Sequence, residues 1–300
     1  MANTIALSKN YIPLLDEVYK KASLTTVLDS DASTARQGAN ANEILIPKLS
    51  MDGLADYSRN SGYTKGDVNL TWETVKFNYD RGRKFEVDTM DNEETAEVAF
   101  GRLAGEFMRT KVAPEADAFT FATLAGISGI SKVATGATLS TGADVMAALK
   151  VALDQMDEDE VPEEQRYLFI TPTLLSSIKA LDTTKSRELL DGFAQIIKVP
   201  QSRFYTAIDL LDGTSSGETA GGYRKHVADV SDVSDVAGKD INFMVIHKPA
   251  VLKYNKHIAS NIITPDANQG SDAWMQKYRK YGLVDAYENK VAGIYLHHKA

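Results

Sequence analysis

The 300-residue sequence contains no cysteine. Disulfide bonds, thiolate zinc sites and cysteine nucleophiles are therefore excluded, and a reducing compartment is permitted without being required. Long apolar runs are also missing, since no stretch approaches the roughly 20 apolar residues of a membrane-spanning helix. The first residues lack the basic segment, apolar core and small-residue cleavage site of a secretory signal. We therefore expect neither secretion nor a membrane partner.

Common enzyme motifs are absent too. The segment "GETAGGYRK" (217–225) lacks a lysine directly after its last glycine, so it does not fit a phosphate-binding loop. No Gly-x-Gly-x-x-Gly fingerprint and no Gly-x-Ser-x-Gly elbow occurs. The sequence thus offers no nucleotide-cofactor site, and we expect no cofactor.

The five histidines do not form a metal-binding pattern. None of them pairs at the four-residue spacing of a helical metal site. His247 ends an apolar stretch and is predicted to be a hydrogen-bonded histidine at the edge of a sheet. Neighbouring strand residues point to opposite faces, so His297 and His298 cannot bind one metal together. The complete set is His226, His247, His257, His297 and His298.

Composition indicates an ordinary globular protein, with 43% hydrophobic and 25% charged residues. Its length favours one large domain or two intertwined domains. The formal net charge of -8 argues against a protein whose main task is binding nucleic acid through phosphates. The charge suits a surface that does not adhere to DNA.

One acidic stretch, "DTMDNEETAEVAFGRLAGEF" (88–107), could carry chemistry. The carboxylates Asp88, Asp91, Glu93, Glu94 and Glu97 lie within about ten residues. They could bind a divalent ion in a hydrolase, or they could begin a helix. Asp91 suits a helix N-cap, with Glu94 three residues later as in a capping box, and acidic residues are stabilised at a helix amino end. Because no histidine is nearby, we favour the helix start.

A long amphipathic helix is predicted to follow. Ala96, Phe100, Leu103 and Phe107 continue one apolar face towards about Ala125. Pro114 lies inside this pattern and should kink the helix.

The segment before the acidic stretch predicts an extended hairpin. Residues 43–51 have strand character, residues 52–67 are rich in turn formers, and "LTWETVKFNYD" (70–80) alternates strictly. An isolated hairpin is marginally stable in water, so one this long should lean on a neighbour. An ordinary hairpin within a larger sheet is the alternative.

The two ends of the chain have their own patterns. Residues 13–28 place apolar side chains on one helical face, and a polar, aperiodic segment follows. This arm could dock on another molecule or pack on its own domain. Near the carboxyl end, residues 273–298 predict a hairpin that turns near Glu288–Lys290.

The middle of the chain predicts helices covering a sheet. A helix from about 142 ends in the acidic segment "MDEDE" (156–160), and residues 167–170 form a short buried strand. Thr171 and Pro172 suit the cap and first turn of the next helix. Further strands are expected at 194–211 and 241–263. Residues 213–240 are predicted to be an exposed loop.

Basic residues form two local clusters. Lys76, Arg81, Arg83 and Lys84 lie at the base of the predicted hairpin, and Lys277, Arg279 and Lys280 lie near the carboxyl end. Phosphates could bind either cluster. In a net acidic chain without interleaved stacking aromatics, partner carboxylates are the favoured targets.

The order of these parts, with several local segments, resembles the major capsid proteins of tailed bacteriophages, whose fold is shared with encapsulin shells. The segments that carry the resemblance are "IALSKNYIPLLDEVYKKASLTTVLD", "GANANEILIPK", "DYSRNSGYTKGDVNLTWETVKFNYDRGRKFEVDTMDNEET" and "INFMVIHKPAVLKY". The resemblance covers essentially the whole chain. It implies an α+β capsid fold with an N-terminal arm, an extended β-hairpin loop, a spine helix in a peripheral domain, and an α/β axial domain.

This resemblance implies boundaries for each part. The arm would occupy residues 1–42, the extended loop 43–87 and the peripheral domain with its spine helix 88–139. The axial domain would span 140–250 with the exposed loop 213–240, and residues 251–300 would return to the peripheral domain.

The implied function is non-enzymatic. Copies of the chain would form pentamers and hexamers of an icosahedral shell that encloses double-stranded DNA without sequence-specific binding. Portal, scaffolding and decoration proteins would be further partners, and the protein would reside in the virion after assembly in the host cytoplasm. An encapsulin-like compartment is the first alternative, and a metal-dependent hydrolase using Asp88–Glu97 is a distant second.

The candidate subunit-interface residues come from the loop, the basic cluster and the acidic stretch. They are Tyr57, Arg59, Tyr63, Lys65, Trp72, Lys76, Arg81, Arg83, Lys84, Asp91, Glu93, Glu94 and Glu97. Some capsids of this fold crosslink subunits through a Lys–Asn bond. Lys65 lies suggestively at the loop tip, but because the sequence has no recognisable partner motif we expect no crosslinking.

Overall fold

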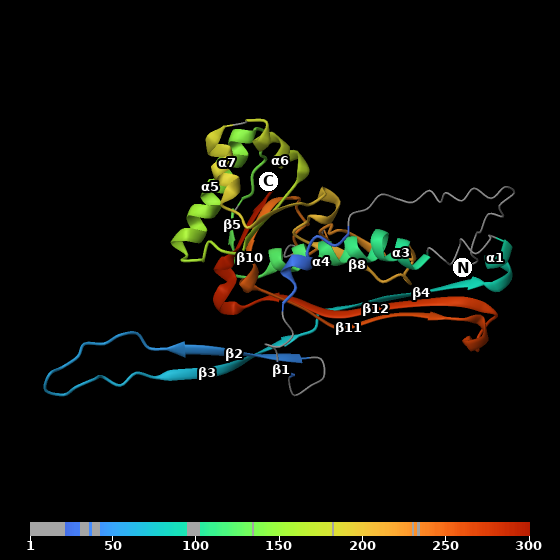
Figure 1. Cartoon of the computed structure of the whole chain (residues 1–300), viewed down its shortest axis with the longest axis horizontal. Coiled ribbons are helices and arrows are strands. Elements are labelled where there is room, and N and C mark those ends of the chain that lie inside the picture. Colours follow the sequence, from blue (N-terminus) through green and yellow to red (C-terminus); the bar gives the residue numbers. More distant parts are fainter. Residues whose placement is uncertain are drawn as a thin grey trace.

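The structure is a computed structural model and describes residues 22–30, 36–37, 43–94, 103–133, 135–181, 183–229, 231–232 and 235–300. Figure 1 shows three parts: a long hairpin projecting to one side, a narrow sheet lined by a long helix, and a lobe of helices around a second sheet. The predicted arm helix over 13–28 lies mostly outside the described residues. Its described end is a 3-10 turn, Thr26–Leu28.

The projecting hairpin is built from β2 (Glu43–Met51) and β3 (Val68–Lys76), which pair antiparallel over their full length. A short strand, β1 (Arg36–Gln37), pairs with the inner end of β2. Figure 1 shows the hairpin extending well away from the body. The predicted extended hairpin is therefore present.

The narrow sheet has the order β11-β12-β4, formed by Val251–Ile263, Ala273–Ala286 and Tyr79–Asp88. The continuous strand predicted over 70–80 is divided here, because β3 ends at Lys76 and β4 pairs with β12 instead. Asn78 stabilises the crossing, since its side chain exchanges hydrogen bonds with the backbone of Val284. The alternation of apolar residues continues across this break, so it gives no signal of the change of sheet.

The acidic stretch begins a helix, α1 (Thr89–Glu94), and α3 (Leu103–Phe107) follows after undescribed residues. The predicted N-cap at Asp91 is wrong. The helix begins at Thr89, so the cap is Asp88, whose carboxylate accepts a hydrogen bond of 2.9 Å from the Met90 N–H. Asp91 lies in the first turn, where negative charge is also favourable.

The helix continues as a π-helical segment, Met108–Val112, and then as α4 (Ala113–Gly126). We name Leu103–Gly126 the spine helix. Pro114 has no N–H for the carbonyl four residues earlier and clashes with it in a regular helix. The widened turn directly before Pro114 relieves this conflict. The expected irregularity at Pro114 is thus present as a π-helical segment.

The lobe contains a five-stranded sheet in the order β5-β13-β10-β6-β7. Its strands are Ser131–Lys132, Ile294–His298, Ile241–His247, Arg166–Ile170 and Gln195–Lys198. The segment after the spine helix contains β5, which pairs parallel with β13. His247 ends β10, which lies between β13 and β6, so the prediction of an edge position is wrong.

Helices cover both faces of this sheet. On one face, Phe121 and Leu124 of the spine helix meet Phe169 and Met244. On the other, α5 (Gly142–Glu158), α6 (Pro172–Lys179) and α7 (Thr184–Asp191) form a second apolar cluster. β10 is buried along its whole length, and its side chains alternate between the two clusters. The predicted arrangement of helices covering a sheet is confirmed.

The expected exposed loop 213–240 has more structure than predicted. It contains β9 (Gly222–Lys225), which pairs with β8 (Ile208–Leu211) in a two-stranded sheet. The turn between these strands includes Gly213 and Gly221, both at positive φ, a backbone conformation that glycine adopts readily. This small sheet lies near the spine helix in Figure 1.

The predicted carboxyl-terminal hairpin is wrong. β12 pairs with β11 and β4, whereas β13 pairs with β10 and β5 in the other sheet. Residues Glu288–Gly293 form a 3-10 helix that carries the chain from one sheet to the other. The polar residues near 288–290 therefore mark a crossover. The remaining 3-10 turns are Gln201–Arg203, Lys248–Ala250 and Pro265–Ala267.

Candidate assembly surfaces

One face of the hairpin is apolar and exposed. Alternate residues of a strand share a face, and the register pairs Leu49 with Leu70 and Met51 with Val68. Their exposed fractions are 50%, 58%, 65% and 67%. Paired Pro47 and Trp72 extend this surface towards the body. We name these six residues the apolar hairpin face: Pro47, Leu49, Met51, Val68, Leu70 and Trp72.

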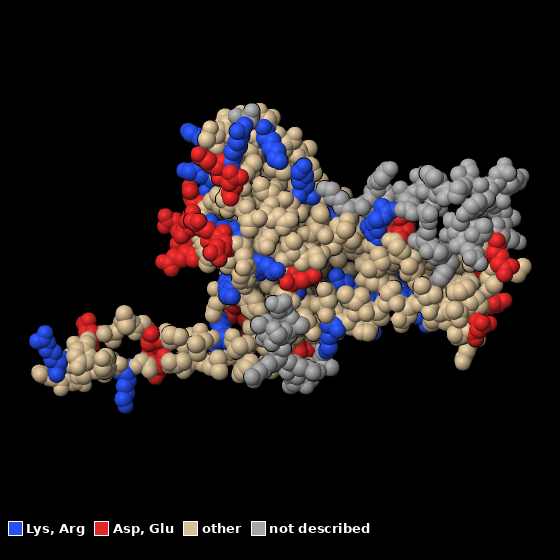
Figure 2. All heavy atoms as spheres, in the orientation of Figure 1, with Lys and Arg blue, Asp and Glu red and all other residues tan. Residues whose placement is uncertain are grey.

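The opposite face of the same strands is polar at this distance from the body, where it carries Lys48, Ser50, Asn69 and Thr71. The hairpin therefore has one surface suited to water and one suited to burial. Figure 2 shows few charged side chains along the hairpin apart from its tip. Contiguous exposed apolar surface on a soluble protein marks a contact with another molecule.

The hairpin tip brings two of the candidate residues together. The rings of Tyr57 and Tyr63 lie 4.8 Å apart, centroid to centroid, in an edge-to-face arrangement. A bridge between Ser58 and Gly62 closes the turn between them. Arg59 and Lys65 are exposed beside this aromatic pair. The tip thus has a small fixed shape of its own.

The base of the hairpin is held to the body by an apolar cluster. Ile44, Ile46 and Val75 are buried with Leu252 and Leu283 of the narrow sheet. This contact involves the hairpin face opposite to the apolar hairpin face, and only its inner end. The hairpin is therefore anchored at one end and leaves its outer apolar surface uncovered.

Charged groups surround this anchor. Lys48 forms an ion pair with Glu288 of the crossover helix. Burial, and then the charges of Glu288 and Asp285, raise the pKa of Glu73, and burial raises the pKa of Asp285. Carboxylates of the hairpin and of the body thus lie close enough to affect one another.

The basic cluster predicted near residues 76–84 is not one surface. Arg81 and Arg83 point towards the spine helix, whereas Lys84 lies on the other face of β4 and pairs with Glu86 at 2.8 Å. Lys76 is exposed at the end of β3. Strand alternation separates these side chains, and the two arginines contribute to a cavity that is partly open to solvent.

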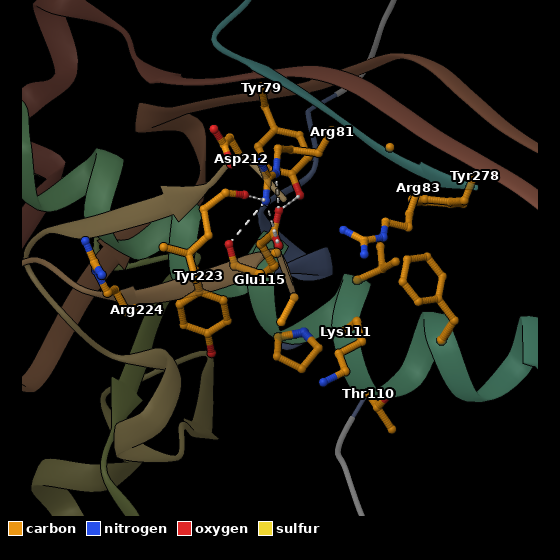
Figure 3. Close-up of a pocket in the computed structure, with 18 of the residues that line it drawn as sticks. Tyr79, Arg81, Arg83, Thr110, Lys111, Glu115, Asp212, Tyr223, Arg224 and Tyr278 are labelled. Atoms are coloured by element: carbon orange, nitrogen blue, oxygen red, sulfur yellow. Dashed lines mark hydrogen bonds and ion pairs between the residues drawn. The ribbon is translucent and has the colours of Figure 1, made fainter. Parts of the chain in front are cut away.

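This cavity has a volume of about 800 Å³ and lies between β4, the spine helix and the β8–β9 sheet. Figure 3 shows Arg81 and Glu115 joined at its centre. Arg81 Nε lies 2.7 Å from Glu115 Oε1, and Arg81 Nη2 donates to the carbonyl oxygens of Leu211 and Gly222. Tyr79 also donates its hydroxyl to Glu115. Arg81 therefore ties three elements together.

The remaining cavity wall is aromatic and cationic. The Phe107 ring meets the rings of Phe85 and Tyr278 in edge-to-face pairs. Burial raises the pKa of Tyr223, on the β9 side, to about 12. The Tyr223 hydroxyl donates to the carbonyl oxygen of Ser202, so this tyrosine stays neutral and positioned.

The acidic stretch shows no metal-binding arrangement in the part that the structure describes. Glu97 and the Glu94 side chain lie outside the described residues. Asp88 caps α1, Asp91 is half-buried, and Glu93 is exposed. Across the described ranges, no group of three or more His, Asp or Glu side chains could hold a metal ion. No described helix is long and apolar enough to cross a membrane.

Trp72 is the one residue of the apolar hairpin face that the sequence analysis named as an interface candidate. The signal for the others is present in "PKLSM" (47–51) and "VNLTW" (68–72), where apolar residues alternate with polar ones. Either alternating set could have faced the core. The packing of Ile44, Ile46 and Val75 against the body shows that the other set is the exposed one.

No protein-family model matches the sequence, and no curated protein matches it. Solved structures do match over nearly the whole chain. The capsid structure of the cyanophage P-SCSP1u matches with a TM-score of 0.63 and 16% identity, covering 98% of this chain and 93% of that chain. The mature capsid of bacteriophage PhiM1 matches with a TM-score of 0.61 and 13% identity, covering 98% and 92%.

The chain has the phage capsid fold. The predicted α+β capsid fold is therefore confirmed. A virus-like particle from Pyrococcus furiosus also matches, with a TM-score of 0.53 and 10% identity, covering 91% of this chain and 97% of that chain. The chain is thus similar in fold to this virus-like particle as well as to the phage capsids.

Proposed function

We propose that this chain is a major capsid protein, many copies of which form an icosahedral shell around double-stranded DNA. The phage capsid fold supports this function, and the observation that carries it is the apolar hairpin face. A soluble chain that exposes Leu49, Met51, Val68 and Leu70 on a projecting hairpin has a surface that needs a partner. Other copies of the same chain are that partner.

The hairpin works by lying across an adjacent copy. Burying a leucine or methionine side chain fully contributes about 1.5–3 kcal/mol, so several such residues on one face stabilise a contact strongly. The anchor at Ile44, Ile46 and Val75 fixes the direction of the hairpin relative to the body. The five-stranded lobe then meets its copies around the axes of pentamers and hexamers.

The enclosed DNA requires no specific contact. The net charge of -8 opposes tight adhesion of packaged DNA to the shell. Portal, scaffolding and decoration proteins act with this shell, and no catalytic step by the chain is required.

The test uses two matched pairs of substitutions on opposite faces of the hairpin. Leu49→Lys with Leu70→Lys places two charges on the apolar hairpin face, and Ser50→Lys with Asn69→Lys places the same charges on the polar face. We expect both variants to keep the wild-type unfolding temperature, because all four positions are exposed. Only the first should lose shells in electron microscopy. Normal shells from the Leu49/Leu70 variant would overturn the proposal.

A compartment that holds an enzyme is the second candidate, because the virus-like particle from Pyrococcus furiosus shares this fold. The contents of the particle separate the two functions. Particles isolated from the native source that hold DNA and a portal favour the capsid. Particles that hold a copurifying enzyme in place of DNA favour the compartment.

A further inference from the structure

The cavity beside β4 has more cationic than anionic side chains. The cations are Arg81, Arg83, Lys111, Arg224 and Lys225, and the carboxylates are Glu106, Glu115 and Asp212. Several of these charges are already paired. Arg81 binds Glu115, Arg224 binds Asp209, and Lys225 binds Asp240. The chemistry still available in the cavity depends on the charges that remain.

Two cations remain without a carboxylate among the described residues. Arg83 donates to the carbonyl oxygen of Thr219 at 3.1 Å, which leaves its positive charge uncompensated. Lys111 is exposed on the spine helix and forms no ion pair within the described ranges. Figure 3 shows both side chains in the same cavity as Tyr278. A guanidinium and an ammonium beside aromatic rings suit a carboxylate-bearing peptide segment.

The chain carries such a segment on its lobe. Residues 157–164, "DEDEVPEE", begin with the last two residues of α5, and we name them the acidic turn. Glu158, Glu160, Glu163 and Glu164 are exposed and form no ion pair within the described ranges. Figure 2 shows a dense acidic patch at the left margin of the lobe, where α5 lies in Figure 1.

The acidic turn is held in a fixed shape. The buried Arg166 guanidinium donates to the carbonyl oxygen of Pro162 at 3.0 Å and also to that of Val161. The Val161 N–H donates to the Met156 carbonyl at 2.9 Å. Because these bonds already order the backbone, little conformational entropy is lost when the turn binds a partner.

We propose that the cavity beside β4 binds the acidic turn of a neighbouring copy. This inference rests on the proposed function, because it assigns one contact between copies in the shell. In Figure 1 the elements of the cavity (β4, α3, α4 and β8) lie to the right of α5. A contact between two different surfaces of identical chains is head-to-tail, and it generates a ring where the rotation closes. Carboxylates of one copy then meet Arg83 and Lys111 of the next.

The test exchanges the charges of the two surfaces. One variant carries Arg83→Glu with Lys111→Glu, a second carries Glu158→Lys with Glu163→Lys, and a third carries all four. The control carries Lys179→Glu with Lys185→Glu, which are exposed on α6 and α7. Sedimentation then gives the concentration at which each purified full-length chain assembles.

Each of the first two variants should need about a tenfold higher concentration to assemble, because like charges now face each other. The variant with all four substitutions and the control should assemble at the same concentration as the wild type. Arg83 also holds the turn at Thr219, so Lys111→Glu alone is measured as well. Lys111 is exposed and has no ion pair within the described ranges, so it can change without loss of folding, and its variant should show the same direction of effect.

The outcomes separate this contact from the proposed function. Shells that form equally well in every variant overturn the contact and leave the function in place. Suppose that both double variants weaken assembly and that the variant with all four substitutions does not restore it. This result also overturns the contact, since the cavity would then bind another segment or partner. If the chain forms only small rings and never shells, and ring formation is weakened in each double variant and restored with all four substitutions, the contact holds and the proposed function is overturned. A wild-type chain that stays monomeric overturns both.

Discussion

At the scale of single residues, Asp117 on the spine helix shows how the chain entering the body is held. Its side chain is fully buried. It accepts hydrogen bonds from Ser23 Oγ, from the backbone N–H groups of Leu24 and Thr25, and from Thr25 Oγ1. Arg203 Nη1 completes the set at 2.9 Å and is itself buried. One carboxylate thus orders Ser23–Thr25 against the spine helix.

We predict that Asp117→Asn lowers the free energy of unfolding by about 3–5 kcal/mol, because a neutral amide breaks the buried ion pair that the Asp117 carboxylate forms with Arg203. Urea unfolding of the unassembled chain measures this change. Asp154→Asn is the matched control. Asp154 is exposed and pairs with Lys150 at 3.6 Å, so its loss should change stability by less than about 0.5 kcal/mol. Equal effects of the two substitutions would contradict this role of Asp117.

His226 gives the small β8–β9 region a dependence on pH. Its Nδ1 lies 2.5 Å from Asp209 and its Nε2 lies 2.8 Å from Asp235. Hydrogen bonds to Asp209 and then to Asp235 raise the pKa of His226 above its usual 6.5, although Arg224 also pairs with Asp209. The two ring nitrogens can donate at the same time only when the ring is protonated to imidazolium.

Because the pKa of His226 is higher in the folded state, the charged imidazolium stabilises that state fully below pH 6.5. This stabilisation is lost as the pH rises through the folded-state pKa. We predict that hydrogen exchange at the Gly238 N–H, which donates to the His226 carbonyl, accelerates over this range beyond the intrinsic effect of pH. In the His226→Gln variant this additional acceleration should be absent. The same pH profile in both proteins would refute a role for the imidazolium.

Residue chemistry was partly predictable from sequence. The acidic stretch was correctly expected to begin a helix, but its cap is Asp88 instead of Asp91. Both aspartates suit a cap, and the choice depends on where β4 ends, which local pattern does not determine. The partners of Asp117 lie about 90 residues away in sequence. Such a site depends on tertiary packing alone.

At the scale of elements, α5 has a complete capping box. Thr141 Oγ1 accepts from the Asp144 N–H at 3.2 Å, and the Asp144 carboxylate accepts from the Thr141 N–H at 2.9 Å. Gly142 then lets α5 lie against α6, since a Cβ there would lie 2.3 Å from the Ser177 carbonyl oxygen. The capping box of Thr141 and Asp144 therefore determines where this helix starts, and Gly142 permits its close packing on α6.

We predict that Thr141→Ala lowers the free energy of unfolding by about 1 kcal/mol, because the Asp144 N–H loses its side-chain acceptor and the capping box is no longer reciprocal. Thermal unfolding followed by circular dichroism measures the loss. Lys150→Ala, on the exposed side of the same helix, is the control and should change stability by less than about 0.5 kcal/mol. A loss no larger than that of the control would show that the capping box contributes little.

Elements with a local signal were predicted well. The buried strand β6, the Pro172 start of α6 and the apolar strand β10 each have a clear period or a turn former beside them. The assignment of strands to sheets was not predicted. β4 and β13 continue the alternation of the segments before them, and each nevertheless pairs in a different sheet. Alternation specifies which side chains share a face and does not specify the partner strand.

At the scale of the whole molecule, the chain is an elongated body with one apolar hairpin and two regions of complementary charge. The hairpin leaves a surface that a single chain does not cover. The acidic turn and the cavity beside β4 belong to different parts of the molecule (Figures 1 and 2). Both features fit a protein whose stable form contains many copies. The assignment of residues 1–42, 43–87, 88–139, 140–250 and 251–300 to capsid domains stays a prediction.

Electron microscopy of the purified full-length chain, with its sedimentation profile, tests this account most directly. We predict closed polyhedral particles, or free pentamers and hexamers that close into particles as the protein concentration rises. A chain that remains monomeric at every concentration, with crowding agents present, would contradict the account.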